Sequence, residues 1–287
     1  MSAKAPPPPP GVHGGAPRVT LLGSVLFSAL LVLFSVAAPG ETPSSAAALA
    51  PASLAPSAVP RSNETMEFSV SYLGVTMGKV RLFVGKVDPT VAPVFLQAQT
   101  SSIMSFITIK QQLATYLDVA TGLPRSASLD AVEGSYRHTD TVQFDRAANK
   151  ATVREKGKYD NTYVVDVPPG TVDFVALVFK LRSLPLQPGM RHEFPVLSGR
   201  KLKTVVAEVV GRETVSTKIG DFPAMKVRVP TGFTGKFSEK NPTYVWFSDD
   251  PRRVVVRITS DFAIGHATAG LVSYAPGAGA PEMSARP

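Results

Sequence analysis

The 287-residue sequence contains no cysteine. Disulfide bonds, thiolate catalysis and cysteine-ligated zinc are therefore excluded. An acylated cysteine of the lipoprotein type is excluded as well. A chain without disulfides has to derive its stability from its hydrophobic core.

Tryptophan and histidine are scarce, with one and four residues respectively. Trp246 lies in the β-prone run TYVWFSDD, which predicts either core packing or the lining of a cavity. His13 lies in a proline-rich stretch, and His138, His192 and His266 are isolated, with no histidine or carboxylate at ligand spacing. We therefore expect structural or surface roles for these side chains, and no metal site.

Charge of one sign is not concentrated anywhere in the chain. Thirty Lys and Arg residues against 22 Asp and Glu residues give a formal net charge of +8. These charges alternate along the sequence, without the basic stripe or recognisable module of a nucleic-acid-binding protein. The pattern predicts a solvated, mildly basic surface and no nucleic-acid partner, and it leaves open a weak attraction to anionic lipid headgroups.

No catalytic motif is present. The chain has no G-x-S-x-G elbow, no Walker loop and no G-x-G-x-x-G followed by a helix. Asp249 and Asp250 could suggest acid–base chemistry or calcium, but adjacent residues of a strand point to opposite faces, and Pro251 follows. We interpret the pair as a strand-ending turn whose side chains bond local backbone N–H groups. The sequence thus predicts a non-enzymatic protein with no catalytic, metal or cofactor site.

The two ends of the chain are biased in composition. Residues 1–18 contain five consecutive prolines, and residues 39–62 are mostly Ala, Pro and Ser. Neither segment has the spaced apolar residues that offset the entropy of ordering, so both are predicted to be disordered, as is the tail 276–287. Residues 63–275 remain for one well-buried β domain.

An uncharged apolar run, residues 19–38, follows Arg18. A basic residue, an apolar stretch and small residues at its end are typical of a secretory signal. Twenty apolar residues can also span a bilayer as a helix. The sequence leaves both open, a cleaved signal and a retained inner-membrane anchor. Either one predicts a periplasmic or secreted location for the domain that follows, and Arg18 on the near side agrees with the positive-inside rule.

Alternation of apolar and polar residues from Glu64 onward predicts antiparallel strands with one buried face. The clearest runs are residues 66–72, 80–84, 142–144, 225–229 and 254–258. Turn residues separate the runs by short links, which favours a meander over a βαβ pattern. Residues 102–107 break the alternation and are interpreted as a short helix or a bent strand.

One segment, TVDFVALVFKLRS from Thr171 to Ser183, is predicted to be a helix. Thr171 can cap its start, Asp173 would lie in the first turn, and Lys180 and Arg182 in the last turn suit the helix dipole. The helix is apolar nearly all round, so we expect it to be buried as a plug in the mouth or concave face of a curved sheet.

The order of these features resembles a family of exported bacterial proteins catalogued as domain of unknown function 3108. The matching segments are residues 66–78, 142–145, 173–182 followed by 186–189, 213–224 and 245–253. One departure is Arg252-Arg253-Val254-Val255, where the family has an Arg-x-Pro-like step. The resemblance implies a mainly β, periplasmic domain: a strongly curved antiparallel sheet or open barrel with one inserted buried helix. No catalytic residues can be carried over from it, because the family has none assigned.

Two classes of function fit this sequence. The first is a structural or scaffold protein of the cell envelope that binds a protein partner through a sheet edge or an exposed apolar patch. The alternative is a periplasmic carrier that holds an apolar ligand such as a lipid in the concave face of the sheet. We take the scaffold as the leading hypothesis.

Overall fold

The structure, a computed structural model, describes residues 60–101, 109–157, 160–230, 242–261 and 265–279. Within these ranges the chain forms one 14-stranded antiparallel sheet and one α-helix, α2 (Phe174–Ser183). The strands are β1 (Thr65–Tyr72), β2 (Val75–Val84), β3 (Val91–Thr100), β4 (Ile109–Asp118), β5 (Pro124–Glu133), β6 (Tyr136–Asp145), β7 (Lys150–Lys156), β8 (Asp160–Asp166), β9 (Arg191–Ser198), β10 (Lys201–Thr217), β11 (Gly220–Val229), β12 (Thr243–Ser248), β13 (Val255–Asp261) and β14 (His266–Ala275).

Strand β1 shows why these segments form strands. Met66, Phe68 and Val70 are buried, whereas Glu67 and Ser69 between them are partly exposed. An extended backbone places these two sets on opposite faces of the sheet, so one face can join the core while the other meets water. The same alternation recurs in β4 and β5.

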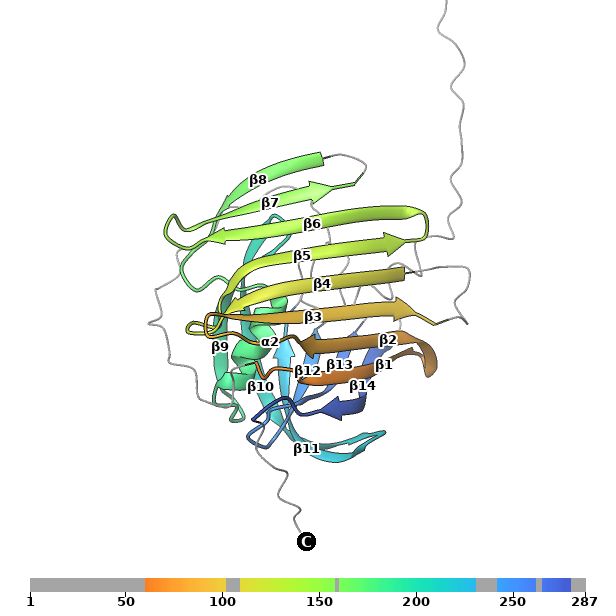
Figure 1. Cartoon of the computed structure of the whole chain (residues 1–287). Helices are drawn as coiled ribbons and strands as arrows, with labels where there is room; N and C mark the ends of the chain where they lie inside the picture. The colour runs from red at the N-terminus through yellow and green to blue at the C-terminus, as the bar shows by residue number, and fades with distance from the viewer. Residues whose placement is uncertain (1–59, 102–108, 158–159, 231–241, 262–264, 280–287) are drawn as a thin grey trace, which may run out of the picture.

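The sheet is a meander that returns to its own start. Its order runs from β8 down to β1, then from β14 down to β9, so each strand pairs with its neighbour in the sequence except at the β8–β9 connection. Strand β1 pairs with β14, and β8 and β9 are left at the two ends. Figure 1 shows β3 to β8 as one curved layer, with β9 to β12 crossing it and α2 between them. The predicted mainly β, open and strongly curved sheet with one buried helix is confirmed.

Helix α2 lies inside this curve and packs against β4 and β9. Seven of its ten residues are buried, and its side chains belong to the main hydrophobic core. Because every side of the helix meets apolar side chains, its sequence is apolar nearly all round. The predicted plug is therefore observed.

The start of α2 differs from the prediction that Thr171 caps it. The capping residue is Asp173, whose carboxylate accepts a hydrogen bond from the Ala176 backbone N–H at 2.7 Å. The Thr171 hydroxyl instead donates to the Pro168 carbonyl at 2.6 Å, because residues 171–172 are extended and lie beside β9. Lys180 lies in the last turn, as predicted.

The long hairpin of β10 and β11 folds over the outer face of the neighbouring strands. Trp246 on β12 is 5% exposed, and its indole N–H donates to the Glu213 carboxylate on β10 at 2.6 Å. Farther along, Arg257 on β13 donates to the Ser216 carbonyl at 3.1 Å. Both faces of β12 are thus covered, one by the core and the other by this hairpin, which explains why its residues are nearly all buried.

The two ends of the described chain meet. Pro60 is buried, the Ser62 hydroxyl accepts a hydrogen bond from the Val87 N–H, and the Ser62 carbonyl accepts one from the Ala278 N–H. The predicted signal or anchor at 19–38 and the irregular segment 102–107 lie outside the described residues. No helix in the described ranges is both long and apolar enough to cross a bilayer.

Candidate functional site

A buried ion pair joins α2 to the start of the sheet. Arg182 and Glu64, with side chains 3% and 0% exposed, form two hydrogen bonds of 2.6 and 3.0 Å. Arg182 also donates to the carbonyls of Arg252 and Arg253, and the Tyr274 hydroxyl donates to Glu64 at 3.3 Å. Both charges are fully partnered, so the pair is a structural tie between α2, the segment before β1 and the turn after β12.

The other end of α2 carries a second buried charge. Asp173 caps the helix and also accepts a hydrogen bond from the Thr115 hydroxyl at 3.0 Å. Burial raises the pKa of Asp173 to about 6, although these hydrogen bonds and the nearby Arg146 guanidinium oppose the shift. The Arg146 guanidinium itself donates hydrogen bonds to the backbone carbonyls of Thr171 and Pro124. This arrangement anchors the helix start to β4.

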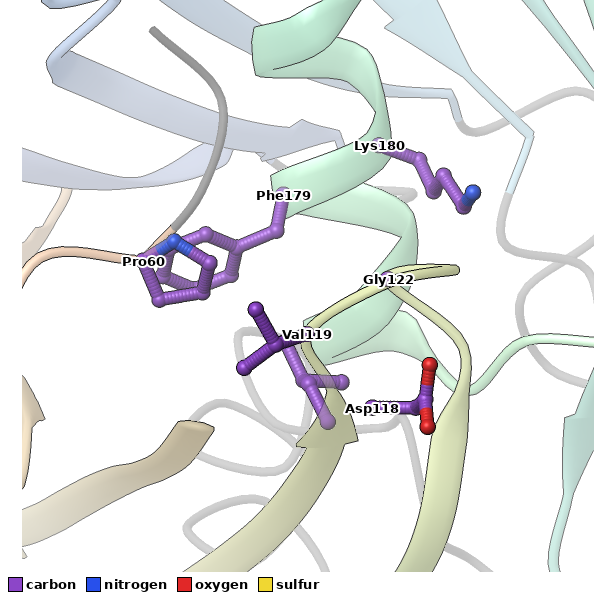
Figure 2. Close-up of a pocket in the computed structure, with 7 residues that line it drawn as sticks. Pro60, Asp118, Val119, Gly122, Phe179 and Lys180 are labelled. Atoms are coloured by element: carbon purple, nitrogen blue, oxygen red, sulfur yellow. The ribbon is translucent and has the colours of Figure 1, made fainter. Parts of the chain in front are cut away.

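Two hollows can be described among the residues that the structure places. The first, beside α2, has a volume of about 10 Å³, room for about one water molecule. Figure 2 shows its lining, with Phe179 and Lys180 leaving α2 in different directions above Gly122. The second, of about 450 Å³, is lined by polar residues of β1, β2, β3 and the β10–β11 turn together with Phe68, Gly78 and Val272. The concave face of the sheet is instead filled by α2 and the main core.

The three histidines of the folded part lie on three separate strands, β6, β9 and β14. The His192 Nε2 atom is 2.9 Å from the Pro185 carbonyl, and His266 is exposed opposite Asp261. The structure therefore does not bring the histidines together. Among the described residues no group of three or more His, Asp or Glu side chains is placed to hold a metal ion.

The Asp249–Asp250 pair forms the turn that the sequence predicts. Asp250 accepts a hydrogen bond from the Arg252 backbone N–H at 2.8 Å. Asp249 lies 2.8 Å from the Arg212 guanidinium and 3.3 Å from that of Arg253. Both carboxylates are thus engaged in holding the β12–β13 connection.

The prediction that His138 is isolated is wrong. Two residues along the same strand face, the Asp140 carboxylate lies 4.0 Å from the His138 Nε2 atom. Asp140 is directly opposite Glu155 on β7, which lies 3.3 Å from the Arg200 guanidinium. Burial raises the pKa of Asp140 to about 6, and His138 opposes this shift while the like charge of Glu155 adds to it. We call these four residues, His138, Asp140, Glu155 and Arg200, the seam cluster.

The sequence alone could have predicted the proximity of His138 and Asp140 within the seam cluster. A His-x-Asp spacing places both side chains on one face of a strand. The partners Glu155 and Arg200 depend on strand register and on tertiary packing, which local pattern does not specify. They could not be paired with His138 from the sequence alone.

The seam cluster lies where the two ends of the sheet meet. The hairpin of β9 and β10 packs against the inner face of β6 to β8, and the Arg200 guanidinium lies 4.3 Å from the Tyr163 ring centre. A second, smaller hydrophobic core fills this contact, made by Val142, Ala151, Val153, Val167 and Leu197 with Phe144, Tyr163, Val165 and Leu202. In the described part of the chain β8 does not pair with β9, and the side chains of the second core bring the open sheet close to a barrel.

The two end strands of the sheet, β8 and β9, differ in the backbone hydrogen bonds at their outer edges. Beside β9, the Val172 N–H donates to the Pro195 carbonyl and the Val172 carbonyl accepts from the Leu197 N–H, both at 2.9 Å. Strand β8 pairs with β7 on one side, and no strand of the described ranges pairs with its other side. It lacks the lysine and proline that commonly protect edge strands, and its Val164 is 62% exposed.

This open antiparallel sheet around an internal helix defines a β-barrel-like protein. The chain belongs to the family described as "Protein of unknown function (DUF3108)", which it matches over residues 67–272. The predicted family is therefore confirmed.

A solved structure resembles the chain in fold. A β-barrel-like protein of domain of unknown function DUF1849 from Brucella abortus is 10% identical, covers 76% of this chain and 98% of its own, and has a TM-score of 0.54. The hypothetical protein CT021 from Chlamydia trachomatis is 8% identical, covers 80% of this chain and 96% of its own, and has a TM-score of 0.33. Curated protein sequences give no match.

Proposed function

We propose that this chain is a non-enzymatic protein of the bacterial cell envelope that binds a protein partner along the free edge of β8. The observation that carries the proposal is the contrast between the two sheet ends: Val172 forms two backbone hydrogen bonds with the edge of β9, whereas no strand of the described part pairs with the outer edge of β8. An unpaired edge presents a row of N–H and C=O groups that an extended segment of a partner can join as an added strand.

The β8 edge is held in place before any partner arrives. On its inner face Tyr163 and Val165 pack on the second core, so little additional ordering is needed on binding. On its outer face, Val164 offers an exposed apolar contact next to Thr162. A partner segment of alternating apolar and polar residues suits these two faces.

The location and the lack of catalysis belong to the same proposal. The apolar run 19–38, preceded by Arg18, supports export across the inner membrane or anchoring to it. None of the four seam-cluster residues lines either of the two hollows, so we assign this cluster to holding the sheet ends together.

Site-specific photocrosslinking tests the edge directly. A photoreactive amino acid at Val164 of the full chain, expressed in its native cells, is expected to give one defined adduct with an envelope protein. Tyr116 is the matched control, because its side chain is 39% exposed on β4, where the residue is paired with Pro93 on β3 and with Ser126 on β5. Absence of an adduct at position 164, or the same adducts at both positions, would contradict the proposal.

Native mass spectrometry of the purified chain tests the carrier alternative. We expect the mass of the protein alone. A lipid or fatty acid bound at one molecule per chain would instead favour the carrier and count against a function through β8.

A further inference from the structure

The larger hollow lies beside β1, β2, β3 and β14, away from β8. Its volume is about 450 Å³, and β1, β2, β3, β14 and the turn between β10 and β11 supply its lining. That turn contributes Lys218, because the β10–β11 hairpin is held over the outer face by the bond from Arg257 to the Ser216 carbonyl. The hollow is therefore bounded by the sheet on one side and by the hairpin tip on another.

A row of cross-strand neighbours forms the floor beside the hairpin tip. Arg257 is opposite Gly270, Gly270 opposite Ser69, Ser69 opposite Lys79, and Lys79 opposite Gln99. Gly270 and Ser69 are small, and a Cβ atom at Gly270 would meet no atom within 4 Å. The middle of the row, Gly270 and Ser69, therefore leaves space above the sheet, and the long basic side chains of Arg257 and Lys79 flank it.

The hollow carries positive charge without a matching negative charge. Lys79 and Lys218 both line it, and no acidic side chain of the described residues forms an ion pair with either. By contrast, Arg81 on the same strand is paired with Glu67 at 3.5 Å. Lys110 on β4 continues the row by one strand. Such a surface attracts anionic ligands.

Uncharged polar groups line the same hollow. Ser69, Thr76 and Gln99 supply hydroxyl and amide groups, which both donate and accept hydrogen bonds, beside the apolar Phe68 and Val272. Groups of this kind match the hydroxyls of a sugar, whereas lysine ammonium groups match a carboxylate or a phosphate. The volume also falls in the range of small-ligand sites, roughly 300–1,000 Å³.

We propose that this hollow is a binding site for an acidic saccharide. Lys79 and Lys218 would contact its acidic groups, and Ser69 and Gln99 its hydroxyls. A bare anion would use the lysines alone, and a neutral saccharide would use the uncharged groups alone. The site stands independently of the proposed partner at β8, because no residue of β8 lines it.

Isothermal titration calorimetry of the full chain with digalacturonate tests the site. We expect saturable binding that weakens as ionic strength rises, because the two lysines are exposed. The double variant K79Q/K218Q should weaken binding at least about tenfold, since it removes charge-assisted hydrogen bonds. The control K86Q/K156Q removes two exposed lysines that line neither hollow and should leave affinity unchanged.

Several results would overturn the assignment. Absence of digalacturonate binding, or equal weakening by K79Q/K218Q and K86Q/K156Q, would reject the site. Maltose bound as tightly as digalacturonate would show that the lysines do not select the ligand. Inorganic phosphate bound as tightly would show a simple anion site and not a saccharide site. Each of these results is independent of crosslinking at Val164.

Discussion

Arg182 and Glu64 form an ion pair whose two side chains are almost completely withdrawn from water. We predict that Glu64→Gln lowers the free energy of unfolding by about 3–5 kcal/mol, because it leaves the guanidinium buried without its counter-charge. Urea denaturation of the wild-type chain and the variant measures this difference.

The matched control is the exposed pair of Lys150 and Asp166, whose atoms are 2.7 Å apart while their side chains are 50% and 88% exposed. Asp166→Asn should change the free energy of unfolding by less than about 1 kcal/mol, since water screens this pair and the side chains lose entropy in forming it. Similar losses for the two variants would show that burial does not set the contribution of Arg182 and Glu64.

Helix α2 is capped by Asp173, whose pKa burial raises from the usual 3.8 to about 6. The unfolded chain therefore releases this proton first as the pH rises, so the contribution of Asp173 to stability is full below about pH 4 and is lost as the pH rises through about 6. We predict that the free energy of unfolding of the wild type falls by about 3 kcal/mol relative to Asp173→Asn across this window.

Asparagine keeps the capping hydrogen bond, so the variant retains the helix start. Urea unfolding of both proteins at a series of pH values gives the difference, in which the titration of Asp140 cancels because both chains contain it. A difference that does not change with pH would refute the buried titration of Asp173.

The local sequence pattern predicted where the strands and the helix lie, but it did not predict which distant segments they contact. The alternation at Met66–Val70 predicted a strand, and the apolar run before Ser183 predicted a buried helix. Each prediction needed only one segment of sequence, and both are confirmed. The cap of α2 was misassigned to Thr171 because residues 171–172 pair with β9, a contact between segments that local propensity does not contain. The hollow at Lys79 and Lys218 was unforeseen for the same reason: it exists only because a hairpin folds over a distant part of the sheet.

At the scale of the whole molecule, side-chain packing brings the two ends of the sheet together, since β8 and β9 do not pair in the described residues. Its centre, where β1 pairs with β14, joins the first and last strands by a continuous ladder. Its two ends are joined by the second core and by Arg200, which pairs with Glu155 and stacks on Tyr163. Stability should therefore decrease from the centre of the sheet toward β8, the strand to which we assign partner binding.

Hydrogen–deuterium exchange measures this gradient. We predict that Arg200→Ala speeds exchange of the β7 and β8 amides about tenfold, the effect of losing roughly 1.4 kcal/mol of local stability, while β1 and β14 are unchanged. Arg154→Ala is the control, because Arg154 is exposed on the opposite face of β7 from Glu155. Faster exchange throughout the sheet would mean that the seam cluster supports the entire fold, and unchanged exchange in β8 would mean that the second core alone holds the seam.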